Sequence, residues 1–116
     1  MKLILGRKND IFLIEITGKL QLFDSNELKG LILKMIKKKI EYFILNMKNV
    51  RAVNSSGIGA LIYLSSTAKK MNLQIAMINV SEGVQKAFEV TKLEDYFPIF
   101  PDLHTVLALF ENRSEL

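Results

Sequence analysis

Residues 42–47 read YFILNM and residues 54–59 read NSSGIG, and these two segments decide the fold class. The first is an apolar run of strand length, and the second is a polar turn with two adjacent hydroxyls where a helix is expected to begin. The arrangement places a serine beside the free N–H groups of a helix N-terminus, which accommodates an anion such as phosphate. Two interpretations of the serine stay open at this point: a phosphorylation acceptor in a switch, or a residue that only caps a helix.

The flanking segments continue the alternation of strands and helices. Strands are predicted at residues 3–5, 11–16, 42–46 and 74–79, with residues 17–19 ending the second strand. Helices are predicted to begin after the N-cap residues Asp24, Asn54 and Ser81, and a last helix follows residues 101–102. A short turn pairs the first two strands antiparallel, whereas the alternation after residue 40 predicts parallel crossovers. The predicted fold class is therefore α/β: one small domain spanning residues 1–116, with a core at about residues 3–111 and a mixed, mostly parallel sheet with packed helices.

The composition argues against catalysis by this chain. The 116 residues have room for a single core, and their 49% hydrophobic and 24% charged content is that of an ordinary globular domain. The absence of cysteine excludes disulfides and thiolate metal sites, and the single histidine, His104, has no plausible ligand partners. Gly57 and Gly59 do not form a kinase-type phosphate-binding loop because no lysine follows at the needed offset. We therefore expect no catalytic, cofactor-binding or metal-binding residues and no enzyme activity.

A lysine cluster contributes to the net charge of +4. It consists of Lys34 and residues 37–39, and we interpret it as the solvated end of a helix, where cations complement the macrodipole. The alternative is a nucleic-acid or lipid patch, which is less favoured because no aromatic residues interleave with the lysines.

The sequence also predicts the compartment. Its longest apolar runs are far shorter than the ~20 residues that a membrane span needs. The apolar stretch at the N-terminus is interrupted too early for the core of a signal peptide. We therefore expect a cytoplasmic protein with no membrane span.

Three segments resemble the STAS domain, the family of bacterial anti-sigma factor antagonists. The family has a Gly-x-Leu-Asp-type turn after the second strand, and this chain has Gly-Lys-Leu-Gln at residues 18–21. Its Asp-Ser-Ser-Gly-Leu-Gly-type loop matches residues 54–59. A Thr-Gly-Leu segment leading to an aromatic matches residues 91–93 with Tyr96 and Phe97. The resemblance runs over about residues 10–110 and implies a small α/β domain.

The resemblance implies a phosphorylation switch. By it, Ser55 is the phosphate acceptor, with Ser56 as the second choice. The implied partner is an anti-sigma factor that is also a serine-protein kinase and that binds ATP and magnesium itself. Unphosphorylated antagonist captures this kinase and frees the sigma factor, whereas phosphorylated antagonist releases the kinase and a PP2C-type phosphatase resets the cycle.

The implied partner-binding surface combines the turn after the second strand with residues 54–59, which we call the serine loop. Its residues are Gln21, Leu22, Phe23, Asp24, Asn54, Ser55, Ser56, Gly57 and Ile58. Leu22 and Phe23 are also explained as a hydrophobic staple beside a helix N-cap, and the two interpretations are compatible.

Two departures from the family pattern favour a second hypothesis. Asn54 and Gln21 stand where the family has acidic residues, so two carboxylates near the hydroxyl are missing. The chain could then be an unswitched STAS scaffold or an accessory subunit of a signalling or lipid-transport complex. A third hypothesis, an enzyme or nucleotide-binding domain acting alone, has the least support.

Overall fold

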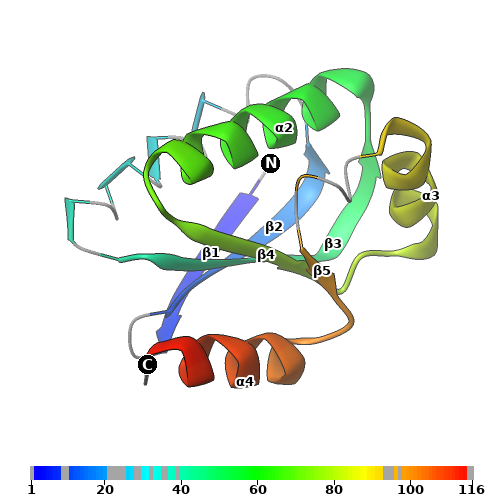
Figure 1. Ribbon diagram of the computed structural model, residues 1–116. Coiled ribbons are helices and arrows are strands. Elements are labelled where there is room, and N and C mark those ends of the chain that lie inside the picture. The colour runs from blue at the N-terminus through cyan, green and yellow to red at the C-terminus, as the bar shows by residue number, and fades with distance from the viewer. Residues whose placement is uncertain are drawn as a thin grey trace.

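The structure is a computed structural model, and it describes residues 2–8, 11–20, 26–27, 30–31, 33–34, 37–38, 40–92, 96 and 98–114. Its centre is a five-stranded sheet in which the strands follow one another in chain order (Figure 1). The first pair is antiparallel and every later pair is parallel. The strands are β1 (Lys2–Lys8), β2 (Ile11–Leu20), β3 (Tyr42–Val53), β4 (Gln74–Ile78) and β5 (Ile99–Phe100). This sheet confirms the predicted α/β class and the prediction of a mixed, mostly parallel sheet.

Helices cover both faces of the sheet. They are α2 (Ser55–Lys70), α3 (Glu82–Thr91) and α4 (Leu103–Ser114). Figure 1 shows α2 and α3 on one face and α4 on the other. Between β2 and β3 the backbone is helical at residues 26–27, 30–31, 33–34 and 37, where the sequence predicts a helix; the predicted cap Asp24 lies outside the described residues. None of the described helices combines the length and the apolar character required to cross a bilayer.

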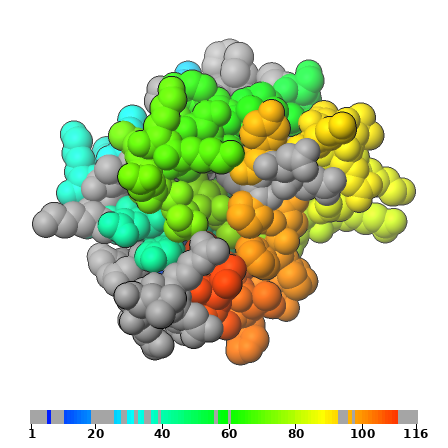
Figure 2. Space-filling view, in the orientation of Figure 1, coloured from blue at the N-terminus to red at the C-terminus, as the bar shows by residue number. Residues whose placement is uncertain are grey.

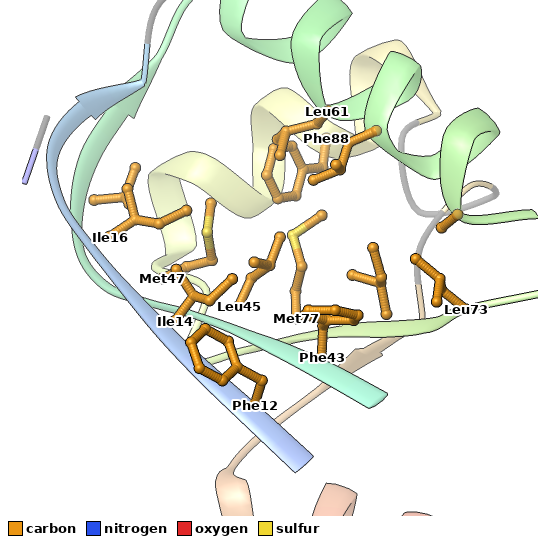
Figure 3. Close-up of a cluster of buried hydrophobic side chains, with 14 of the residues drawn as sticks. Phe12, Ile14, Ile16, Phe43, Leu45, Met47, Leu61, Leu73, Met77 and Phe88 are labelled. Atoms are coloured by element: carbon orange, nitrogen blue, oxygen red, sulfur yellow. The ribbon is translucent and has the colours of Figure 1, made fainter. Parts of the chain in front are cut away.

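The two covered faces account for the apolar runs in the central strands. Phe43 and Leu45 point into the larger core, between the sheet and helices α2 and α3 (Figure 3). Ile44 points the other way, into a smaller core with Val106 and Phe110 of α4. Because successive side chains of a strand alternate between faces, a strand covered on both sides reads as an unbroken apolar run.

Several strand bounds differ from the prediction, and β1 spans Lys2–Lys8 instead of residues 3–5 because residues 6–8 also pair with β2. β2 continues to Leu20 instead of ending at residues 17–19, and β3 continues to Val53 instead of ending near residue 46. The two extensions pair with each other, from Thr17↔Asn49 to Leu20↔Val53. The register shifts twice along this pairing, which disturbs the side-chain alternation. That disturbance, with exposed polar residues such as Lys48, makes the extension of β3 resemble a loop in the sequence.

Strand β5 was not predicted. It contains two residues, with Ile99 paired to Met77 and Phe100 paired to Ile78 of β4. A strand this short has no periodicity of its own. Its assignment depends on the neighbouring strand.

Candidate functional site at the N-terminus of α2

The end of β3 leads through one residue into α2. That residue, Asn54, is extended (φ −87°, ψ 176°), and its Oδ1 accepts a hydrogen bond from the Gly57 N–H at 2.8 Å. Its carbonyl oxygen accepts from the Ile58 N–H at 3.0 Å. Asn54 is therefore the N-cap of α2, as the sequence predicts. The oxygen that caps the helix belongs to Asn54 and not to Ser55.

Ser55 is the first residue of α2 and is exposed to solvent. The helix start carries no acidic residue in its first turn. A helix N-terminus has N–H groups without intrahelical acceptors and the positive end of the macrodipole. An anion attached to the Ser55 oxygen would therefore meet favourable electrostatics from its own helix.

The other predicted residues of the loop differ in accessibility. Asn54 is exposed, whereas Ile58 is only 7% exposed and packs in the larger core. Gly57 is buried, and the side chain of Ser56 lies outside what the structure describes. The side chain of Ile58 therefore offers little surface to a partner, although the sequence places it on the contact surface.

The second predicted segment of the partner-binding surface directly follows strand β2. Gln21, Leu22, Phe23 and Asp24 lie outside the described residues. The last described residue before this segment is Leu20. It pairs with Val53, which immediately precedes Asn54. The extended pairing of β2 with β3 therefore brings the chain preceding residue 21 to the start of the serine loop.

A pair of asparagines, Asn46 within β3 and Asn79 directly after β4, was missed by the sequence analysis. Asn46 Oδ1 accepts from Asn79 Nδ2 and from the Lys48 N–H, both at 3.1 Å. Asn79 has a left-handed backbone (φ 57°), a conformation that asparagine tolerates better than most residues. Both residues fall at the carboxyl ends of predicted parallel strands, and this shared position is the signal that could have identified them.

Another polar contact supports the extension of β3. Asn49 Nδ2 donates to Glu15 Oε1 at 2.6 Å. Ile14 and Ile16, on either side of Glu15, point into the larger core beneath α2. Glu15 therefore projects from the opposite face of the sheet. This carboxylate is held by Asn49 and does not form part of the serine loop.

The cap gives a stability prediction. Asn54→Ala should lower the free energy of unfolding by about 0.5–2 kcal/mol, because the Gly57 N–H loses its side-chain acceptor. Asn54→Asp should be nearly neutral, since the two residues cap helices about equally well. Urea denaturation followed by circular dichroism measures both variants. An equal loss in the two would contradict the capping role.

Comparison with known proteins identifies the family. The family model described as STAS domain matches residues 3–106. The chain belongs to the STAS domain family. A relative from Staphylococcus epidermidis, an anti-sigma-B factor antagonist, is 22% identical over 87 residues, which cover 75% of this chain and 81% of that protein.

Two solved structures show the same fold as this STAS domain. A sulfate transporter family protein from Wolinella succinogenes superimposes with a TM-score of 0.83 at 21% identity, covering 96% of this chain and 93% of that one. The unphosphorylated anti-sigma factor antagonist SpoIIAA superimposes with a TM-score of 0.75 at 16% identity, covering 95% and 97%. The STAS domain fold is thus shared with an anti-sigma factor antagonist and with a transporter-family protein.

Proposed function

We propose that this STAS domain is an anti-sigma factor antagonist whose binding is switched by phosphorylation of Ser55. The observation that carries the proposal is the exposed Ser55 at the first position of α2, beside a cap made by Asn54. The hydroxyl is accessible and is not needed to hold the helix. The similarity to anti-sigma factor antagonists supports the same assignment.

The physics of the modification supports a switch at the surface. A phosphate adds about −1.5 to −2 charges at pH 7. At a helix N-terminus that charge is stabilised by ~0.3–1 kcal/mol or more, so the domain should stay folded. A dianion in a contact surface is costly to desolvate, and a loss of about 1.4 kcal/mol already weakens binding tenfold. Phosphorylation would then change partner binding and leave the fold intact.

The partner in this cycle is an anti-sigma factor that is also a serine-protein kinase. It binds ATP and magnesium itself, so the STAS domain supplies the acceptor hydroxyl and a contact surface and performs no catalysis. Unphosphorylated STAS domain sequesters the kinase and releases the sigma factor for transcription. A PP2C-type phosphatase restores Ser55, and the whole cycle operates in the cytoplasm.

Intact-mass measurement after incubation with the purified partner kinase and ATP tests the proposal. We expect the mass of one phosphate on the wild-type chain, none on Ser55→Ala, and one on Ser66→Ala. Ser66 is a suitable control because it is an exposed serine of the same helix. An unmodified wild-type mass, with the kinase active on a reference substrate, would reject the switch, and so would a phosphate that persists in Ser55→Ala.

A second candidate is an unswitched STAS scaffold or accessory subunit. It is favoured by the uncharged cap Asn54, by the absence of acidic residues in the first turn of α2, and by the fold shared with a transporter-family protein. Partner capture that is the same for wild type, Ser55→Ala and Ser55→Asp would support this candidate over the switch.

A further inference from the structure

Two helical segments lead into the neighbouring strands β3 and β4, at the end of the sheet where these parallel strands begin. Tyr42, at the start of β3, pairs with Gln74, at the start of β4, and the Gln74 N–H donates to the Glu41 carbonyl at 2.8 Å. The helical segment before β3 and helix α2 before β4 both return the chain to this edge. In Figure 1 the cyan segment and the end of α2 are both on the left. The starts of β3 and β4 are neighbours although more than thirty residues of sequence separate them.

Five exposed lysines lie on or directly after the two helical segments that lead to these strand starts, and we call them the lysine edge. Its members are Lys34, Lys37, Lys38, Lys69 and Lys70. The first three are spaced as residues on one side of a helix, and the last two lie in the last turn of α2. Within the part of the chain that the structure describes, none of the five ammonium groups is in an ion pair. Glu41 is an exposed carboxylate at the same edge, so among the described residues there positive charge exceeds negative charge.

Helix capping does not account for so many cations. A cation in the last turn of a helix complements the macrodipole, but the effect falls off within that turn. The sequence interpretation of Lys34 and residues 37–39 as a helix end holds locally. It does not anticipate that the fold adds Lys69 and Lys70 from another helix. The combined cluster resembles the groups of four to eight lysines and arginines that bind anionic lipids.

Uncharged neighbours of the lysines fit a membrane surface. Met71, the C-cap of α2, is 43% exposed directly after Lys70. Beside Lys69 the surface is hollowed, with a volume of about 320 Å³ and a lining that includes Asn72 and the exposed Tyr96. Methionine and tyrosine at the rim of a cationic surface can enter the headgroup layer, where amphipathic side chains concentrate. Figure 2 shows this side of the molecule, with the cyan segment and the end of α2 at its left.

We propose that the lysine edge binds an anionic membrane surface through lipid headgroup phosphates. Lysine ammonium groups are mobile point charges that suit a diffuse anionic layer. A nucleic-acid site would be expected to present arginine forks or an element that enters a groove, whereas this edge presents the ends of two helices. Ser55 lies at the other end of α2, about 22 Å away at 1.5 Å per residue. A domain held by its lysine edge would therefore keep Ser55 turned away from the membrane and accessible to a partner.

Vesicle flotation with the full chain tests the proposal. We expect binding to vesicles of phosphatidylcholine mixed with phosphatidylglycerol, no binding to phosphatidylcholine alone, and release by high salt. Each lysine near an anionic surface strengthens binding by roughly fivefold. The double variant Lys69→Glu with Lys70→Glu should therefore weaken binding by more than about tenfold. The matched control is Lys48→Glu with Arg51→Glu, which changes the net charge equally on the exposed part of β3.

These controls distinguish binding through the lysine edge from an effect of net charge and from a loss of folding. Equal weakening in the two double variants would overturn the proposal, and so would binding to neutral vesicles or no binding to anionic ones. Lys69→Gln with Lys70→Gln, checked by circular dichroism, removes the charge without placing carboxylates at a helix C-terminus. Retention on DNA with no vesicle binding would assign the edge to nucleic acid instead. Ser55→Asp should leave vesicle binding unchanged, so the result does not depend on the phosphorylation switch.

Discussion

Phe88→Ala should lower the free energy of unfolding by about 3–5 kcal/mol. Phe88 is fully buried on α3 and belongs to the larger core. Figure 3 shows it pointing into the same cluster as Leu61 of α2 and Met77 of β4. Removing the ring leaves a cavity between two helices and the sheet, and a close-packed interior collapses only partly around it. Because a domain of this size is stable by only about 5–15 kcal/mol, the loss is a large fraction of the total.

Val90→Ala provides the matched control for this prediction. Val90 lies in the same helix, two residues from Phe88, but it is 84% exposed. Its replacement should change the free energy of unfolding by no more than about 0.5 kcal/mol. Guanidinium denaturation monitored by circular dichroism measures both variants. Similar losses of unfolding free energy in the two variants would mean that the burial of Phe88 does not hold α3 against the sheet.

Ser55→Asp should weaken capture of the partner kinase by at least about tenfold while the domain stays folded. The new carboxylate occupies the first position of α2, where the macrodipole stabilises it by ~0.3–1 kcal/mol. The thermal midpoint should therefore stay the same or rise slightly. Binding falls because a charge in the contact surface has to be desolvated without a partner for it. Calorimetric titration with the purified kinase measures the affinity, and a thermal melt checks the fold.

The control for Ser55→Asp is Ser66→Asp, which places the same charge on an exposed position further along α2. Ser66 Oγ donates to the Ile62 carbonyl at 3.2 Å within the helix, and it lies about three turns from the start of α2. Its replacement should leave capture unchanged. Equal weakening in both variants would indicate a general charge effect, and full capture by Ser55→Asp would remove the basis for the switch.

Local chemistry made part of the candidate site predictable. An asparagine before two serines and an apolar helical pattern identify a helix N-cap, and the structure confirms that Asn54 caps α2 with its side chain. The same reasoning correctly placed Ser81 as the cap of α3, where its Oγ accepts from the Val84 N–H. Such bonds join residues two or three apart, so the sequence contains everything that they need.

Non-local pairing decided the remainder of the site. The burial of Ile58 depends on how α2 packs on the sheet, and the Asn46–Asn79 bond depends on the pairing of β3 with β4. Neither is visible in a local pattern. The reach of β3 to Val53 depends on its pairing with the end of β2, including two shifts of register that no local propensity specifies.

The sequence by itself determined the order of the helices and of the four longer strands, the α/β class, the caps at Asn54 and Ser81, and the position of Ser55 at the start of a helix. Periodicity and capping are properties of a few consecutive residues, so they can be deduced from the sequence. Only the tertiary structure decided the two-residue strand β5, the long pairing of β2 with β3, and the pairing of the two strand starts that follow the lysine-bearing segments. Each of these joins segments that are distant in the chain, and their proximity follows from parallel strand pairing and the packing of helices on the sheet.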